Sequence, residues 1–187
     1  MKHKIILLVI IVLAFILRIY RLDQVPPSLY WDEASLGYNA FSISQTLRDE
    51  HGVFLPVTNF AAFGDYKPVG YIYAIVPFIK LFGLSEIAVR LPSALAGTLL
   101  VLVTYYLVKE LFQISNFKFQ IAQLAALFVA VSPWALQMSR AGFEANLATL
   151  FSGLGIFFIK SVNKKFYILY ILSAIFFALS MYTFNSH

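Results

Sequence analysis

The sequence contains no cysteine, and it has few of the features that mark common soluble enzymes. The lack of cysteine excludes disulfide bonds and thiolate metal sites. The three histidines, His3, His51 and His187, are far apart in the chain and show no metal-ligand spacing. No Asn-x-Ser/Thr site, internal repeat or low-complexity run is present. No serine lies in a Gly-x-Ser-x-Gly context, so a serine hydrolase is unsupported.

Charged residues are also scarce. They make up 12% of the 187 residues, whereas 60% are hydrophobic and the mean hydropathy is +0.79. A soluble domain of this size could not bury so much apolar surface, so the composition predicts a membrane protein. The net charge of +5 could indicate nucleic-acid binding in a soluble protein. Here the placement of the charges indicates membrane topology instead, and we expect no nucleic-acid partner.

The N-terminus predicts a first membrane span. A basic start is followed by thirteen apolar residues, 5–17, which resembles a signal peptide. The next residues, Arg18–Leu22, are bulky and charged and show no small-x-small cleavage pattern. We therefore predict an uncleaved span at 4–20, with Lys4 and Arg18 snorkelling to the membrane surfaces.

Five more apolar stretches follow this span. They cover residues 68–84, 91–108, 120–138, 146–159 and 166–182. The first of them contains two prolines, a lysine and several aromatic residues, which is typical of a helix lying at headgroup depth. If it lies on the outer surface and the other four cross, the segments left on the cytoplasmic side hold seven lysines and one acid. That asymmetry obeys the positive-inside rule.

The predicted fold is therefore all-α: a polytopic membrane helical bundle of five spans, with juxtamembrane helices in a large first external loop. The N-terminus is cytoplasmic, span 1 is 4–20, the external loop is 21–90, and spans 2–5 lie within 91–187. The chain stops directly after the last apolar stretch. Because an odd number of spans ends there at a membrane boundary, we expect residues 1–187 to be the N-terminal part of a longer protein.

Trp31-Asp32-Glu33 is the strongest candidate for a functional site. Two adjacent carboxylates just outside a span are suited to holding a divalent cation or to accepting a proton from a substrate hydroxyl. In this interpretation Asp32 is the general base or metal ligand, and Glu33 supports it. The alternative is that Asp32 only caps a helix over 34–41, since acids favour helix starts.

Two other polar stretches are expected on the same face. Gly and Pro at the ends of 64–68 predict a turn that presents Asp65 and Lys67, where the lysine either neutralises a lipid phosphate or anchors the neighbouring helix. Arg140 and Glu144 flank a second external turn. Charged side chains this close to hydrocarbon carry a free-energy cost, so we expect them to be paired or functional. They either pair with each other at helical spacing or face the site, Glu144 as a second acid and Arg140 as a phosphate ligand.

These residues, in this order, resemble the polytopic glycosyltransferases of the GT-C fold. Within that fold the resemblance is to the branch of dolichyl-phosphate-mannose protein mannosyltransferases and the aminoarabinose transferase of lipid A. The residues that carry it are Trp31-Asp32-Glu33, Asp65–Pro68, Ser85–Ala94, Ser139-Arg140 with Glu144, and Tyr182–Ser186. The resemblance covers nearly the whole chain, but only the N-terminal portion of such enzymes.

The resemblance implies a transferase that uses a polyprenyl-phosphate sugar, and we expect no organic cofactor. It implies Asp32 as the catalytic acidic residue with Glu33 as its neighbour, Lys67 as a contact to the lipid phosphate, and Glu144 as the acid of the second external loop. That acid is commonly Asp in the family, so the side chain here is one methylene longer.

A second departure concerns a metal site. The aminoarabinose branch has a Glu directly before its Lys-Pro pair, and this chain has Tyr66 there. The nearest acid, Asp65, lies one residue earlier. Asp65 and Asp32 are therefore the two candidates for holding Mg²⁺ or Mn²⁺.

The sequence thus predicts a membrane glycosyltransferase that moves a sugar from a polyprenyl-phosphate donor to a lipid, glycan or protein acceptor. We expect the site on the outer face of a prokaryotic plasma membrane. The acceptor hydroxyl would lose its proton to Asp32, while Lys67, Arg140 or a metal ion stabilises the leaving phosphate. Three alternatives stay open: a non-catalytic carrier subunit for polyprenyl lipid or polysaccharide, a structural membrane subunit in which the acids only cap helices, and an inactive fragment of a transferase.

Overall fold

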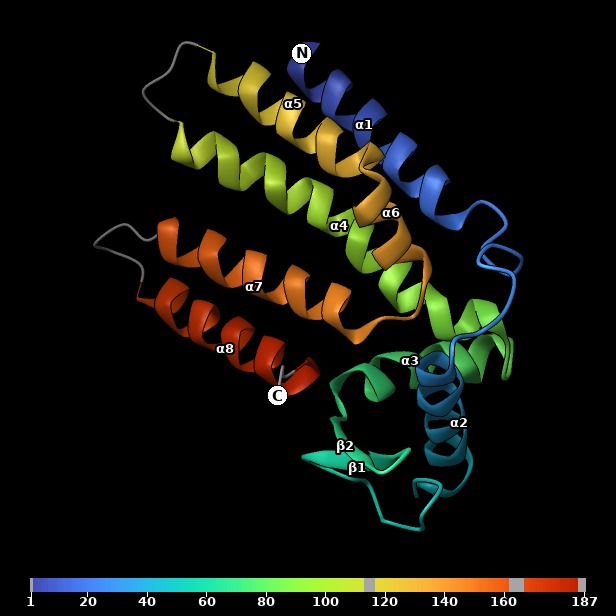
Figure 1. The fold of residues 1–187 in the computed structure, drawn as a ribbon. Helices are drawn as coiled ribbons and strands as arrows, with labels where there is room; N and C mark the ends of the chain where they lie inside the picture. The colour runs from blue at the N-terminus through green and yellow to red at the C-terminus, as the bar shows by residue number, and fades with distance from the viewer. Residues whose placement is uncertain (1, 113–116, 162–166, 185–187) are drawn as a thin grey trace.

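A computed structural model describes residues 2–112, 117–161 and 167–184 (Figure 1). The helices of this part of the chain are α1 (Lys2–Ile19), α2 (Trp31–Thr46), α3 (Gly70–Phe82), α4 (Glu86–Leu111), α5 (Lys118–Val131), α6 (Pro133–Arg140), α7 (Glu144–Lys160) and α8 (Ile168–Thr183). The strands are β1 (Asn59–Ala62) and β2 (Asp65–Pro68). The structure is mostly helical, as predicted, and it adds one small antiparallel hairpin that the sequence did not predict.

The five longer apolar helices α1, α4, α5, α7 and α8 lie side by side, and α2, α3 and the hairpin gather at one end of them (Figure 1). We call this the hairpin end of the bundle. The helix α4 is central, because it packs against α1, α5, α6 and α7 in the bundle and against α3 at the hairpin end. At the opposite end α1 meets α5, where the amide of Gln123 donates to the carbonyl oxygen of His3 at 3.0 Å.

The central helix α4 is long enough to cross a membrane. Its 26 residues span about 39 Å. It begins earlier than the predicted span at 91–108, because the Ser85 hydroxyl accepts a hydrogen bond from the Ala88 N–H (3.4 Å) and caps the helix. Among the described residues, α4 is the one helix that is both long and apolar enough to cross a membrane by itself. The bent pair α5–α6 is a second candidate if its two helices form one span. The five-span arrangement therefore stays a prediction.

The predicted span 120–138 is not one straight helix. It breaks between α5 and α6, whose axes differ by 55°. Pro133 has no N–H, so the carbonyl of Val129 loses its usual partner four residues on. The guanidinium of Arg18 replaces it, donating to the carbonyls of Val129 and Ala130 at 3.1 Å each. Arg18 is fully buried in this arrangement, so the prediction that it snorkels to the surface was wrong.

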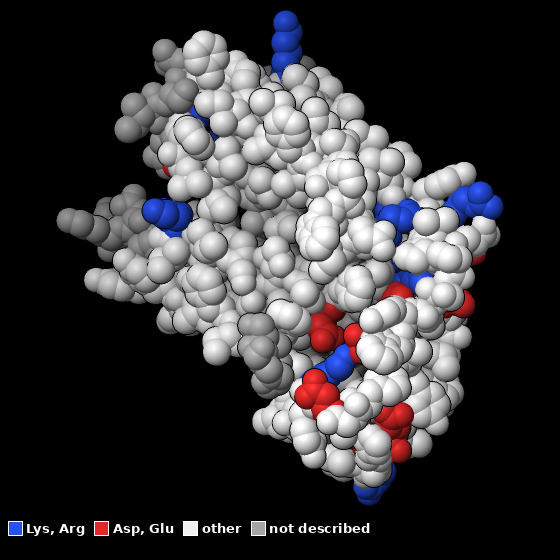
Figure 2. All heavy atoms as spheres, in the orientation of Figure 1, with Lys and Arg blue, Asp and Glu red and all other residues white. Residues whose placement is uncertain are grey.

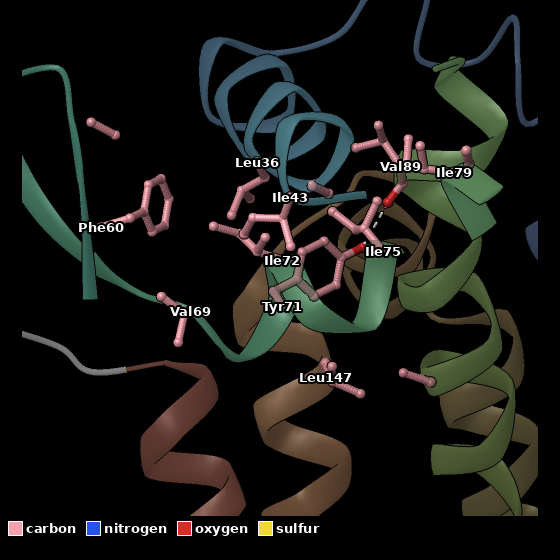
Figure 3. Close-up of a cluster of buried hydrophobic side chains, with 14 of the residues drawn as sticks. Leu36, Ile43, Phe60, Val69, Tyr71, Ile72, Ile75, Ile79, Val89 and Leu147 are labelled. Atoms are coloured by element: carbon pink, nitrogen blue, oxygen red, sulfur yellow. Dashed lines mark hydrogen bonds between the residues drawn. The ribbon is translucent and has the colours of Figure 1, made fainter. Parts of the chain in front are cut away.

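The predicted interfacial segment 68–84 contains helix α3. One face of α3 is buried in an apolar cluster, where the Tyr71 hydroxyl donates to the carbonyl of Val89 at 3.0 Å. Figure 3 shows the side chains that meet there, from α2 (Leu36, Ile43), β1 (Phe60), α3 (Tyr71, Ile72, Ile75, Ile79), α4 (Val89) and α7 (Leu147). The cluster fixes α2, α3 and the hairpin against the ends of α4 and α7. It thereby positions the residues described next.

The predicted turn at 64–68 is instead strand β2 of the hairpin. The reversal lies just before it, at Phe63 and Gly64, which both have positive φ (54° and 81°). A pair of positive φ values is typical of the tight turns that join antiparallel strands, and glycine adopts that conformation without strain. Lys67 therefore lies on strand β2, three residues before α3 begins at Gly70.

Candidate functional site

Asp32 and Glu33 lie in the first turn of α2, which begins at Trp31. Tyr30 is the N-cap residue, so the alternative in which Asp32 caps the helix was wrong. The capping contact comes from Glu33, whose carboxylate accepts a hydrogen bond from the Tyr30 N–H at 2.8 Å. Asp32 is not the N-cap residue, and its side chain is about one quarter exposed (26%).

Glu33 is almost completely buried and binds two other parts of the chain. Its Oε1 accepts from the Arg90 guanidinium of α4 at 2.9 Å and from the N–H of Gly142 at 2.8 Å. Gly142 belongs to the turn between α6 and α7. A Cβ there would lie 3.2 Å from the Val89 carbonyl oxygen, which is closer than an ordinary contact, so this turn packs tightly against α4. Glu33 thus fixes α2 against α4 and the α6–α7 turn.

Arg90 completes this buried arrangement. Its guanidinium also donates to main-chain carbonyls of the segment between α1 and α2, those of Leu22, Pro26 and Ser28, at 2.7–2.9 Å. Arg90 lies within α4 and has no exposed side-chain surface. A single arginine beside a long apolar stretch was the available signal, because a charge there requires a partner.

Asp32 points to other partners. Its Oδ1 forms an ion pair with the Nζ of Lys67 on β2, a residue 35 positions away in the sequence. The lysine side chain is also only partly exposed (17%). The hairpin therefore brings a positive charge to the first turn of α2, where the sequence placed both residues on one face.

Glu144 joins this pair from α7, of which it is the first residue. Burial raises the pKa of Glu144 from the ordinary 4.5 to about 7; the positive charge of Lys67 acts in the opposite direction, and the carboxylate of Asp32 adds to the increase. Near neutral pH this carboxyl group is therefore divided between its protonated and ionised forms.

Asp32 and Glu144 line the same pocket. It has a volume of about 180 Å³, and its walls are Asp32, Met138, Phe143, Glu144, Ala145 and Phe184. We call it the charged pocket. In Figure 2, acidic and basic side chains gather at the hairpin end beside a hollow, while the surface over the long helices is mostly uncharged. The pocket thus combines two acids with apolar walls, and Lys67 is paired with one of those acids.

Arg140 does not face this pocket. Its guanidinium donates to carbonyls at and after the end of α1, including those of Leu17 (2.6 Å), Tyr20 (2.8 Å) and Val25 (2.9 Å). These contacts satisfy acceptors that a helix C-terminus leaves open. The alternative of an i, i+4 pair with Glu144 is also not realised, since Arg140 ends α6 and Glu144 begins α7.

Asp65 lies exposed on β2, where its carboxylate accepts a hydrogen bond from the N–H of Tyr66 at 2.7 Å. In the described part of the chain, no group of three His, Cys, Asp or Glu side chains is arranged to hold a metal ion. The positive charge that lies beside Asp32 is the ammonium group of Lys67. The Mg²⁺ or Mn²⁺ site predicted at Asp32 and Asp65 stays a prediction, since one or two carboxylates together with a substrate phosphate can also hold such an ion.

A comparison with protein families identifies the family of the chain. The model of the family described as dolichyl-phosphate-mannose-protein mannosyltransferase matches residues 8–183, which is nearly the whole chain. The chain belongs to this mannosyltransferase family. No curated protein and no solved structure matches the chain. Family membership makes the chain a membrane glycosyltransferase of the mannosyltransferase kind, and it confirms the resemblance found in the sequence.

Among the residues that the sequence predicted for this mannosyltransferase, Asp32, Lys67 and Glu144 come together. Glu33 follows Asp32 in the chain but is turned into the protein, and Arg140 and Asp65 lie elsewhere. Sequence reasoning missed two apolar wall residues of the charged pocket, Met138 and Phe143, and it included Phe184 only as part of the Tyr182–Ser186 stretch of the family resemblance. No pattern distinguishes these side chains from the many other apolar residues near helix ends.

Proposed function

We propose that this member of the mannosyltransferase family transfers a sugar from a polyprenyl-phosphate donor to a hydroxyl group of an acceptor, at the outer surface of the membrane. The observation that carries the proposal is the charged pocket, where Asp32 and Glu144 meet and Lys67 pairs with Asp32. These three side chains supply a proton acceptor, a cation for phosphate and a group that titrates near pH 7.

The reaction assigns one step to Asp32. The acceptor hydroxyl oxygen attacks the anomeric carbon of the sugar and forms a new C–O bond, while the bond from that carbon to the phosphate oxygen breaks. The proton of the hydroxyl passes to the Asp32 carboxylate. Asp32 suits this step because its side chain borders the pocket and takes no part in the helix cap.

Lys67 stabilises the leaving phosphate. An ammonium group has three N–H donors, so Lys67 can bind a phosphate oxygen while it remains close to Asp32. Negative charge grows on that oxygen as the glycosidic bond breaks, and a positive charge held in a partly buried pocket lowers the barrier to this step. The ion pair with Asp32 keeps the lysine in place before the donor arrives.

Glu144 adjusts the charge of the pocket. When Glu144 is protonated, its charge is zero and the Asp32–Lys67 pair is neutral overall. When Glu144 ionises, these three groups carry a net charge of −1, which repels a phosphate. Because the pKa of Glu144 is about 7, donor binding should weaken as the pH rises through neutrality.

In this proposal α1, α4, the bent pair α5–α6, α7 and α8 are the five spans, and α3 lies along the outer surface. The distribution of charge supports this topology. Helix termini at the end opposite the hairpin carry lysines (Lys2, Lys4, Lys109, Lys118, Lys160). Lysine-rich ends face the cytoplasm according to the positive-inside rule. The charged pocket then lies on the outer side, at the depth of lipid headgroups.

The proposal is tested with purified protein in liposomes. The donor is polyprenyl phosphate carrying radiolabelled mannose, and a membrane extract supplies hydroxyl acceptors. We expect label to move from the donor into a product while polyprenyl phosphate is released, at a rate above that of protein-free liposomes. Radiolabelled GDP-mannose in place of the lipid donor should give no product. Label that stays in the lipid donor, or transfer from the nucleotide sugar alone, would contradict the proposal.

A further inference from the structure

Four aromatic side chains form a continuous strip beside the charged pocket. The ring centroid of Tyr30 is 6.3 Å from that of Phe143 and 5.6 Å from that of Trp31. Trp31 in turn stacks on Phe63, with a centroid distance of 5.7 Å and an interplanar angle of 23°. We call these four residues the aromatic strip. It joins the start of α2, the tip of the β-hairpin and the residue before α7, which are far apart in the sequence.

One end of the aromatic strip reaches the charged pocket. Phe143 forms part of the pocket wall, as does Asp32. Asp32 also follows Trp31 directly in the first turn of α2. Two separate connections, one through the pocket wall and one through the helix, therefore place the strip beside the carboxylate that accepts the proton in the proposed function.

The rest of the strip is open to solvent. The residues Tyr30, Trp31 and Phe63 are between 51% and 67% exposed. Single exposed aromatic residues are ordinary, whereas contiguous ones mark a binding surface. Tyr30 and Phe143 also line a second pocket of about 230 Å³, whose wall includes the exposed polar residues Ser28 and Gln137. The strip thus offers flat apolar ring faces next to a hydroxyl and an amide group.

Phe63 contributes its ring from a strained backbone. It is the first of the two residues that join β1 to β2, and its φ is 54°. Asparagine and glycine are preferred at this position of such a turn, and phenylalanine is an outlier there. Strain of this kind persists mostly at functional sites. The ring that the strained turn presents is the one that stacks on Trp31, so a use for that ring gives the strain a reason.

A sugar ring matches the chemistry of the aromatic strip. One face of a pyranose carries C–H groups, and its rim carries hydroxyl groups. The C–H face stacks on aromatic rings, whose faces hold partial negative charge, and the rim forms hydrogen bonds with side chains such as Ser28 and Gln137. A peptide is held mainly through main-chain hydrogen bonds, which ring faces do not supply.

A membrane lipid matches the strip less well. Trp31 directly precedes Asp32, and Phe63 lies two residues before Asp65. Insertion of these rings into the bilayer would draw both carboxylates toward hydrocarbon, which costs free energy. The neighbouring acids therefore favour a polar ligand that stays in water.

We infer that the aromatic strip binds a sugar residue of the acceptor, so that the acceptor of the transfer is a glycan. This inference rests on the proposed function and adds the chemical class of the acceptor. A hydroxyl group of the bound sugar lies at the Asp32 end of the strip. Its oxygen attacks the anomeric carbon of the donor, the bond from that carbon to the phosphate oxygen breaks, and the proton passes to Asp32.

Tryptophan fluorescence tests sugar binding without any transfer. The chain has two tryptophans, so Trp134→Phe leaves Trp31 as the reporter. Soluble trisaccharides of mannose, glucose and N-acetylglucosamine are added one at a time to the protein in detergent. We expect at least one of them to change the emission of Trp31 saturably. Phe63→Asn suits the turn but removes the ring, and it should weaken this binding by about tenfold.

Phe54→Asn is the matched control. Phe54 is 58% exposed, lies between α2 and β1, and has its ring 5.8 Å from the guanidinium carbon of Arg48, outside the aromatic strip. This variant should bind the sugar like the parent protein. The inference is overturned if no trisaccharide gives a saturable change, or if both variants lose affinity equally. It is also overturned if only a peptide containing Ser and Thr, or only added phospholipid, changes the emission.

Transfer assays separate this inference from the proposed function. With the bound trisaccharide as acceptor, Phe63→Asn should raise the KM for the sugar by about tenfold and leave the KM for polyprenyl-phosphate mannose unchanged. Transfer to a peptide or lipid without sugar binding overturns the glycan site and keeps the transferase. Sugar binding that Phe63→Asn weakens, without transfer to any acceptor, overturns the transferase and keeps the glycan site. Neither binding nor transfer overturns both.

Discussion

The Asp32–Lys67 pair and the Glu33–Arg90 pair begin at adjacent residues, yet they lie in opposite surroundings. The side chains of Arg90 and Glu33 are 0% and 1% exposed, whereas those of Lys67 and Asp32 are 17% and 26% exposed. The buried pair has additional partners in the main chain, on both the acid and the base. The open pair borders a pocket.

This difference indicates how one dipeptide can serve two purposes. Neighbouring residues in the first turn of a helix point in different directions, so Glu33 faces α4 while Asp32 faces the pocket. An ion pair without exposure to water is tolerated only when its hydrogen-bonding groups are satisfied, as they are for Glu33. The carboxylate oxygens of Glu33 are therefore already occupied by partners within the protein. Asp32 has fewer partners and is available to a substrate.

The largest effect is expected from removal of the buried acid. In Glu33→Ala the Arg90 guanidinium stays buried without its carboxylate, and the Gly142 N–H loses its acceptor. Breaking one side of a buried pair costs about 3–5 kcal/mol, so we expect little folded protein and no transfer. Yield of monodisperse protein and thermal unfolding in detergent measure this. If Glu33→Ala is as stable as the wild type, the Glu33–Arg90 pair is not the structural pair that this comparison requires.

Lys67→Met tests the accessible pair of the comparison, Asp32–Lys67. The pocket is partly open to water, so the loss of its cation should affect folding only slightly. Loss of a charged hydrogen bond to the donor phosphate should raise the KM for the lipid donor by about tenfold to a hundredfold. Lys67→Arg should recover part of the affinity. A variant whose kcat, KM and donor binding all match the wild type would argue against a phosphate contact.

Glu144→Gln should have a smaller effect, visible in the dependence on pH. Donor binding by the wild type should weaken as the pH rises through about 7, and the variant should lose this dependence because glutamine stays neutral. Donor affinity measured between pH 6 and 8 checks this. If the variant keeps the pH dependence of the wild type, a group other than Glu144 causes that dependence.

The raised pKa of Glu144 also predicts how the stability of the protein depends on pH. The folded state raises the pKa of Glu144 from 4.5 to about 7, so it binds the proton more tightly than the unfolded state does. Stability contributed by this group therefore falls as the pH rises from about 4.5 to about 7 and stays level above that range. Glu144→Gln should lack this fall in unfolding temperature. An identical pH profile for both proteins would contradict the buried position of the carboxyl group.

The smallest effect is expected at Asp65. Asp65→Asn changes an exposed carboxylate outside the charged pocket, so transfer and unfolding temperature should both match the wild type. Activity measured with and without EDTA adds a second readout. A marked loss of transfer in the variant, restored by added Mg²⁺ or Mn²⁺, would return Asp65 and Asp32 to a shared metal site.

The sequence predicted which residues of the open site come together, and topology explains why. Charge placement put the loop with Asp32 and Lys67 and the turn before Glu144 on one face, and the structure brings those three residues to one place. The role of Arg90 could not be predicted, because it depends on how α4 packs against α2 and the segment between α1 and α2.

Local backbone features were harder to predict than charge placement. The hairpin depends on positive φ at Phe63, a residue with no preference for that conformation. The break at Pro133 was hidden because residues on both sides are apolar, and hydropathy continues across it.

Whether Asp32 performs chemistry while Glu33 holds the architecture is tested most directly by the transfer rate of Asp32→Asn, measured per mole of folded protein. Asparagine keeps the size of the side chain but is a poor proton acceptor. We predict an unfolding temperature like that of the wild type together with a loss of transfer of about 10²–10⁴-fold. Transfer that survives at nearly the wild-type rate, or a loss that follows unfolding of the variant, would contradict this assignment.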